Sequence, residues 1–199
     1  IKPFIKYGTT TLEAKSGYGL TLDDEIKSLE VIKKIDSELD IDIVPTFLGA
    51  HDIPLEYKNR KHEYIDLICD KMIPEIAEKK LAVFCDVFCE PGYFNLEESE
   101  KIINQAKNYN LIPRLHVDEF VNSSGAEFAV KMNAISADHL MSVSDTGIKA
   151  LSKSNTVAII LPGTTFFLNC DKYANGRKMI DEGCNLSIAS DFNPGTCTI

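Results

Sequence analysis

The most informative stretch of the chain is residues 111–120, in which an apolar run ends in His116, Asp118 and Glu119. An imidazole and two carboxylates at the end of a buried strand indicate a metal site or a proton-transfer site, because neutral nitrogen and anionic oxygen are ligands of catalytic zinc. The pattern returns near the C-terminus, where an apolar run leads into Asp191. Two such strand ends on one rim would supply half of a catalytic divalent-metal site.

Other residues after apolar runs have both a functional and a purely structural interpretation. Tyr18, between two glycines, could reach a substrate or could pack within a glycine-rich turn. His51 and His139 could be catalytic, and the recurrence of histidine after apolar runs favours this, although a lone histidine is usually a partly buried structural residue. Asn193 and Gly195, with the proline between them, form a typical turn sequence after Asp191.

Apolar runs of strand length alternate with helical patterns along the chain. The strand-like runs are residues 9–14, 41–48, 81–88, 111–115, 135–138, 156–161 and 186–190. Their ends recur at intervals near the ~30 residues of a parallel βαβ unit. Polar, glycine and proline residues follow these runs, and the C-terminal ends of strands are where a (β/α)8 barrel has its active site. The pattern therefore predicts an α/β fold of TIM-barrel type in one domain, residues 1–199.

Seven strand-like runs are one short of a closed barrel. An open doubly wound sheet is the alternative, although the chain contains no GxGxxG or P-loop motif. Helices are predicted at residues 24–39 with Asp23 as N-cap, at 58–80 with an interruption before Pro74, and at 95–109, 124–132, 145–152 and 174–182. Residues 164–167 could line a pocket or simply pack.

Composition restricts the classes of function. The 199 residues carry a formal charge of -9, which argues against nucleic-acid binding because phosphate contacts need clustered lysine and arginine. We see neither a membrane-length apolar stretch nor a signal peptide. The six cysteines lack the spacing of a disulfide framework, which favours free thiols in the cytoplasm. Because the chain begins with Ile1 and ends shortly after Asp191, we expect it to be part of a longer protein.

Seven segments resemble, in order, motifs of the imidazolonepropionase family within the amidohydrolase superfamily. They are KSGYGL (15–20), TFLGAH (46–51), DVFCE (86–90), LHVDEF (115–120), SADHL (136–140), LPGTTFFL (161–168) and ASDFNPGT (189–196). The resemblance implies a metal-dependent (β/α)8 barrel that hydrolyses the cyclic amide of 4-imidazolone-5-propanoate. The product would be N-formimidoyl-L-glutamate, formed during histidine degradation.

The resemblance also implies roles for individual residues. His116 and Asp191 match metal ligands, with zinc or iron as the metal, and Glu119 and His139 match active-site residues around the reacting carbonyl. The matches to substrate-binding or product-binding positions are Tyr18, His51, Glu119, Asn193, Gly195 and Thr196. For the mechanism we expect Asp191 to accept a proton from the attacking water, His139 to stabilise the oxyanion and Glu119 to handle the proton of the ring nitrogen.

The chain also departs from the family pattern. The family's first barrel strand carries a His-x-His pair that supplies two further metal ligands, and all four histidines of this chain are isolated. The arginine that binds the propionate group and the small β-sandwich have no match either. We therefore expect barrel strands two to eight, an incomplete metal site and no activity from the chain alone. A homodimer is a possible assembly, because unpaired sheet edges favour association.

Two other functions fit the sequence less well. One is a related amidohydrolase that deaminates a heterocycle, since the barrel and the metal site are shared across the superfamily. The other is a non-catalytic remnant of such an enzyme. The combination of Tyr18, His51 and Asn193 favours the imidazolone as substrate.

Overall fold

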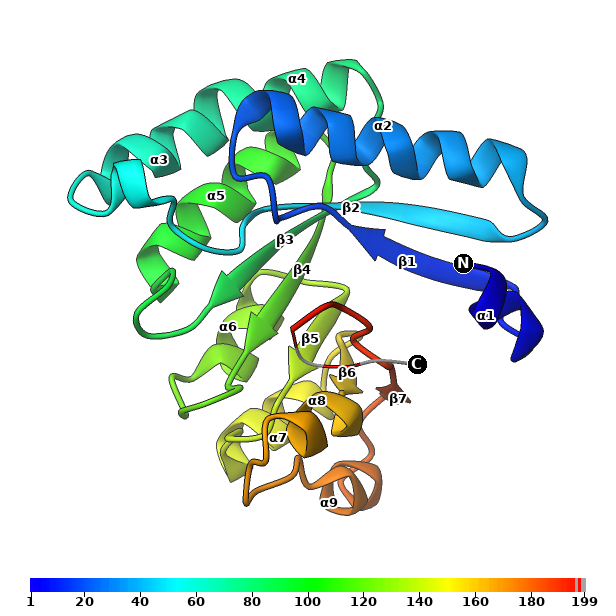
Figure 1. Ribbon diagram of the computed structural model, residues 1–199. Coiled ribbons are helices and arrows are strands. Elements are labelled where there is room, and N and C mark those ends of the chain that lie inside the picture. Colours follow the sequence, from blue (N-terminus) through cyan, green and yellow to red (C-terminus); the bar gives the residue numbers. More distant parts are fainter. Residues whose placement is uncertain (196, 198–199) are drawn as a thin grey trace. The chain divides into compact units, whose positions relative to one another are not determined.

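The computed structural model describes residues 1–195 and residue 197. Within these residues, seven strands form one sheet in the order in which they occur along the chain (Figure 1). The strands are β1 (Thr11–Lys15), β2 (Asp42–Ala50), β3 (Phe84–Cys89), β4 (Ile112–Val117), β5 (Ser136–His139), β6 (Val157–Ile160) and β7 (Leu186–Ile188). Parallel βα repeats in chain order are the arrangement of an incomplete (β/α)8 barrel, so the predicted fold class is confirmed. One predicted binding residue, Thr196, lies outside the described residues.

Helices separate the strands. They are α1 (Lys2–Lys6), α2 (Leu22–Glu38), α3 (Lys61–Leu67), α4 (Ile73–Glu78), α5 (Leu96–Asn108), α6 (Gly125–Lys131), α7 (Asp145–Leu151), α8 (Pro162–Phe167) and α9 (Gly176–Asp181), with the 3-10 turn η1 (Leu55–Tyr57) and the π-helical turn η2 (Ile68–Met72). The chain divides into two compact units: unit 1 is residues 1–88 and 97–113, and unit 2 is residues 89–96 and 114–199.

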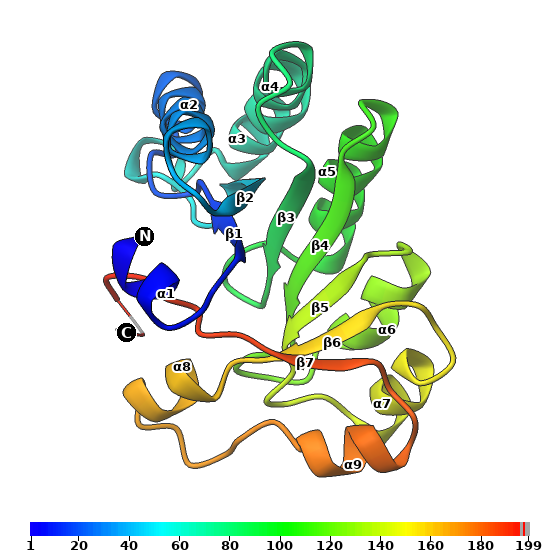
Figure 2. The same ribbon diagram turned by 90° about the vertical axis from the view of Figure 1, so that its right-hand side faces the viewer.

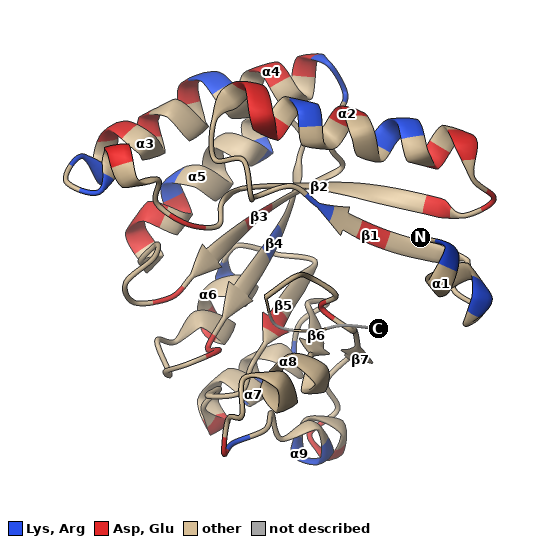
Figure 3. Cartoon of the chain, viewed as in Figure 1, with Lys and Arg blue, Asp and Glu red and all other residues tan. Residues whose placement is uncertain are grey.

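Unit 1 is built on β1, β2 and β3. β1 pairs with β2 in parallel, from Thr11 opposite Asp42 to Lys15 opposite Thr46. Helix α2 packs on β2 through its buried Leu29, while its outer side carries charged side chains of both signs (Figure 3). The rest of the core is formed by fully buried side chains that include Phe47, Tyr64, Ile68, Met72, Ile73 and Ile76.

Unit 2 contains most of β4 and the strands β5 to β7, which lie side by side in Figure 2. β4 pairs with β5 from Arg114 opposite Ser136 to Val117 opposite His139. The shared core is small and apolar, with Leu115, Ala137, Leu140, Ala129, Leu151 and Ala158 fully buried. None of the helices in the part of the chain that the structure describes is both long and apolar enough to cross a membrane.

One helix prediction needs correction. The N-cap of α2 is Thr21 and not Asp23, because the Thr21 hydroxyl oxygen accepts a hydrogen bond from the Asp24 N–H and leaves Asp23 inside the helix. Residues 164–167, which could line a pocket or simply pack, belong to the short helix α8, which Pro162 starts at a position that tolerates the missing N–H.

The long helix predicted at residues 58–80 is interrupted, as expected, but by a π-helical turn. This turn, η2, lies between α3 and α4 and ends just before Pro74. A π turn accommodates one extra residue in a helix, and it keeps Ile68 and Met72 buried on the same side as Ile73.

The hydroxyl group of Tyr64 gives a test of this core. Tyr64 is fully buried and donates a 2.7 Å hydrogen bond to the Gly49 carbonyl near the end of β2. Tyr64→Phe leaves that carbonyl without this donor, so we expect the free energy of unfolding to fall by about 1–2 kcal/mol in urea titrations. Tyr7→Phe, at an exposed position, is the matched control; an equal loss in both variants would contradict the assignment.

Candidate active site

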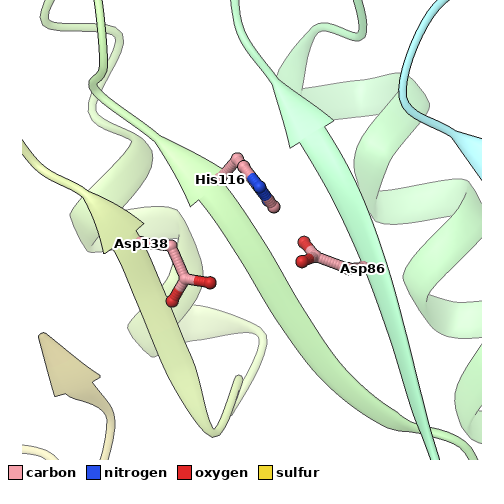
Figure 4. Close-up of side chains that lie close together, drawn as sticks. All are labelled: Asp86, His116 and Asp138. Carbon is pink, nitrogen blue, oxygen red and sulfur yellow. The ribbon is translucent and has the colours of Figure 1, made fainter. Parts of the chain in front are cut away.

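His116 lies near the C-terminal end of β4, and its side chain is buried. It stands opposite Asp138 of β5, and the two side chains offer ligand atoms within 4.8 Å of each other (Figure 4). The Asp138 carboxylate is also 3.3 Å from the guanidinium group of Arg114, which neutralises its charge. A cation bound through Asp138 would therefore compete with an arginine.

Asp86, which Figure 4 also labels, belongs to β3 in unit 1. Its side chain is fully buried and forms a 2.7 Å ion pair with Lys15, whose ammonium group lies 2.8 Å from Glu13. Aspartate and histidine are suitable donors for a divalent cation. Within its own unit, however, the Asp86 carboxylate already has a cationic partner, so its negative charge is compensated without a metal.

Glu119 and His139 form the centre of the candidate site in unit 2. Both are almost fully buried, and His139 Nδ1 lies 3.5 Å from Glu119 Oε1. The His139 ring also lies next to the ring of His116, with 5.1 Å between the centroids. The end of β4 and the end of β5 thus bring together three of the predicted site residues.

Burial changes the acidity of Glu119. The pKa of this carboxyl group is raised to about 7, mainly by desolvation; His116 lowers it, and the negative charges of Asp191 and Glu90 raise it further. A group that titrates near neutral pH can both give and take a proton under physiological conditions. The arrangement is therefore suited to proton transfer.

Glu90 holds the loop that carries Glu119. Its buried carboxylate accepts a 2.5 Å hydrogen bond from the Glu119 backbone N–H through Oε1, while Oε2 has no hydrogen-bond partner among the described residues. Burial raises the pKa of Glu90, and backbone N–H groups of the loop counteract the shift. No role for Glu90 is predicted from the sequence, although its place shortly after the apolar run 81–88 was the available signal.

Asp118 has a structural role. Its side chain accepts hydrogen bonds from the N–H groups of Ser123, Gly125 and Ala126, at 2.9–3.0 Å, and so anchors the start of α6. Two carboxylates, those of Asp118 and Glu119, follow β4. Only that of Glu119 lies beside His139.

Asp191 follows β7 and is held by its neighbours. Its Oδ2 accepts a 2.7 Å hydrogen bond from the Thr164 hydroxyl at the start of α8. Asn193 closes the following turn, since its side-chain N–H donates to the Asp191 carbonyl at 2.8 Å and its Oδ1 accepts from Gly195 N–H at 2.8 Å. Asn193 and Gly195 therefore shape this turn, and the charge of Asp191 acts on Glu119.

Several of these residues have a left-handed backbone. The φ angles are +51° at Asp118, +79° at His139, +57° at Leu140 and +51° at Asp191. Residues with a side chain adopt this conformation at a cost of about 1–2 kcal/mol. The bends turn the chain sharply at the ends of β4 and β5 and after β7.

The predicted substrate-binding pair, Tyr18 and His51, comes together within unit 1. The two rings meet edge to face with 5.0 Å between their centroids, and Tyr18 is 65% exposed. His51 Nδ1 lies 2.8 Å from the Gly17 carbonyl oxygen. The ring of Phe88 lies on another side of His51, at 6.1 Å.

The raised pKa of Glu119 predicts a pH dependence of stability. Because the folded state favours the protonated form, the contribution of this group is complete below its unfolded pKa of about 4.3 and is lost as pH rises through about 7. Relative to Glu119→Gln, which does not titrate, the native chain should lose roughly 3 kcal/mol of unfolding free energy between about pH 4 and 8.

Urea titrations in the presence of a chelator measure this difference. The exposed Glu78→Gln variant is the control and should follow the native chain at each pH. Parallel pH profiles of the native chain and Glu119→Gln would contradict the assignment.

The chain is similar to curated imidazolonepropionases along nearly its whole length. It is 50% identical over 193 residues to that of Brevibacillus brevis and 49% identical over 193 residues to that of Alkaliphilus oremlandii, in both cases over 97% of this chain. The aligned part is 45% and 46% of these relatives, so the chain spans somewhat less than half of their length. No family model matches the chain.

Solved structures show the same fold at low sequence identity. A guanine deaminase from C. acetobutylicum superimposes with a TM-score of 0.72 and 18% identity, over 98% of this chain and 49% of that one. An adenine deaminase from Arthrobacter aurescens gives a TM-score of 0.69 and 12% identity, over 95% of this chain and 59% of that one. Over 193 of its 199 residues the chain is thus a homologue of the imidazolonepropionases, and it corresponds to rather less than half of such a protein.

Proposed function

We propose that this chain provides most of the active-site residues of an imidazolonepropionase that acts in the cytoplasm. The reaction would be hydrolysis of the cyclic amide C–N bond of 4-imidazolone-5-propanoate, which gives N-formimidoyl-L-glutamate. The observation that carries the proposal is the proximity of His116, Glu119 and His139 at the ends of β4 and β5. The chain that contains them is 50% identical in sequence to an imidazolonepropionase over 193 residues. Both units would belong to a single metal-dependent barrel domain.

Unit 2 offers two of the at least three protein ligands that a catalytic divalent metal needs. His116 supplies a buried imidazole and Asp191 a carboxylate, and this combination of nitrogen and oxygen donors fits zinc or iron. When bound, such a cation polarises a carbonyl group and makes water acidic near neutral pH. Catalytic zinc sites have three protein ligands, so two donors require completion, for which we propose a pair of histidines outside these residues.

The remaining chemistry would fall to acid–base groups of unit 2. Asp191, whose Oδ2 is oriented by Thr164, accepts the proton of the attacking water. Glu119, with its pKa near 7, carries a proton that it can pass to the ring nitrogen when the C–N bond breaks. His139 donates a hydrogen bond to the oxyanion that develops on the carbonyl.

We propose substrate-binding roles for residues in each unit separately. Tyr18 and His51 of unit 1, whose rings meet edge to face, would contact the imidazolone ring. In unit 2, Asn193 and Gly195, with Thr196, would contact the substrate or product, and Glu119 would bind the substrate as well as transfer a proton. That two copies of the chain form a homodimer stays a prediction.

The role of Asp191 can be tested by hydrolysis of 4-imidazolone-5-propanoate. The experiment uses this chain joined to the flanking segments of the Brevibacillus brevis relative, which is 50% identical to it. We expect Asp191→Asn to lower kcat by roughly 10²–10⁴-fold, because the proton acceptor is lost. Asp171→Asn, at an exposed position, is the control with the same change of charge. An Asp191→Asn enzyme with the kcat of the parent would refute the assignment.

Metal content gives a separate test. With two donors in place of at least three, the 199-residue chain should retain well under one equivalent of zinc or iron after dialysis, as measured by mass spectrometry. The chain joined to the relative's flanking segments should retain about one equivalent, and His116→Ala should remove it. One equivalent or more of metal on the 199-residue chain would contradict the proposal that its two donors are too few to retain the metal.

A further inference from the structure

The carboxylate of Glu25 is buried in unit 1 and bonded by backbone N–H groups of the preceding loop. Glu25 is fully buried in the first turns of α2. Its oxygens accept hydrogen bonds from the backbone N–H groups of Gly17 at 2.9 Å, Gly19 at 3.0 Å and Leu20 at 2.9 Å. Burial of a carboxylate is unfavourable unless such donors replace water. Neither the sequence analysis nor the proposed reaction gives Glu25 a role.

The loop that Glu25 holds passes tightly over the end of β2. Gly17 has a φ of +108°, and a Cβ at this position would lie 2.7 Å from the Leu48 carbonyl oxygen. The loop is also tied to the same residue of β2, because Ser16 Oγ accepts a hydrogen bond from the Leu48 N–H at 3.1 Å. The loop is thus fixed by β2 on one side and by Glu25 on the other, which defines the direction of its carbonyl groups.

One of these carbonyl groups determines the protonation of His51. The Gly17 oxygen lies 2.8 Å from His51 Nδ1, and a carbonyl oxygen can only accept a hydrogen bond. Nδ1 must therefore carry the proton, and in the neutral ring Nε2 is then an acceptor. The rings of Tyr18 and Phe88 adjoin the same imidazole.

We propose that Glu25 is a positioning residue, which acts through Gly17 to hold His51 in the Nδ1–H tautomer. His51 then presents Nε2 as a hydrogen-bond acceptor beside two aromatic rings. Such a group selects a planar ring with an N–H or O–H donor. The identity of that ring rests on the proposed function, whereas the tautomer and its dependence on Glu25 do not.

Long-range ¹H–¹⁵N NMR of the histidine rings of the 199-residue chain tests the tautomer directly, at a pH where imidazole is neutral. The native chain should show His51 as Nδ1–H. Glu25→Gln places a side-chain N–H₂ group among three backbone donors, so His51 should become a mixture of tautomers. The amide protons of Gly17, Gly19 and Leu20 should exchange with solvent at least about tenfold faster.

Asp23→Asn is the matched control, because it removes a carboxylate from the same helical turn at an exposed position. It should leave both the His51 spectrum and the three exchange rates unchanged. Glu25→Asp retains the charge at a shorter reach and should give intermediate exchange rates and a smaller change of tautomer.

Three results would overturn the proposal: an Nε2–H tautomer in the native chain, a native His51 spectrum in Glu25→Gln, or an equal change in Asp23→Asn. If Glu25→Gln does not fold, the proposal is judged on the His51 tautomer of the native chain and on the tautomer and exchange rates of Glu25→Asp. Because none of these readouts needs turnover, failure of the tautomer prediction and failure of the proposed hydrolysis are distinguishable.

Discussion

Hydrogen bonds from backbone N–H groups to buried carboxylates shape the loops on which the candidate site depends. Glu25 binds the loop that carries Tyr18, Glu90 binds the N–H of Glu119, and Asp118 binds the start of α6. Charge-assisted hydrogen bonds of this kind are about twice as strong as neutral ones, and they offset the cost of burying an ionised group. The loops after these strands are therefore fixed by side chains from neighbouring segments, which is how a loop can hold a catalytic group as rigidly as a strand does.

The same concentration of acidic groups sets the electrostatics of unit 2. Glu119 is buried and feels the charges of Glu90 and Asp191, and both raise its pKa, whereas His116 lowers it. A divalent cation would compensate the negative charge that these groups share. Neighbouring Asp138 is different, because Arg114 already compensates it. The acidic residues of unit 2 thus differ in their surroundings: Asp138 is paired with an arginine, whereas Glu119 is buried near two other acidic groups.

The fold was largely predictable from sequence, since parallel strands buried on both faces give continuous apolar runs that are easy to recognise. All seven strands were expected near their observed positions. The candidate site was predictable where a residue lies at or shortly after the C-terminal end of a strand, as His116, His139 and Asp191 do. Glu25 was not, because its contacts reach backward from a helix to a loop that contains no strand signal. Thr21 replaced Asp23 as the N-cap because either residue type can cap a helix, and only the path of the loop decides between them.

The left-handed backbone at His139 has a consequence for variants of this protein. Glycine adopts a φ of +79° without the steric cost that a side chain incurs, so the residue that would suit this position best for stability has no imidazole. In the proposed reaction His139 stabilises the oxyanion, so a glycine that relieved the backbone strain at the end of β5 would also remove the imidazole on which that proposal depends. Leu140 also has a positive φ, but its side chain is fully buried in the core of unit 2, so glycine at position 140 would lose more in packing than it gains in backbone freedom.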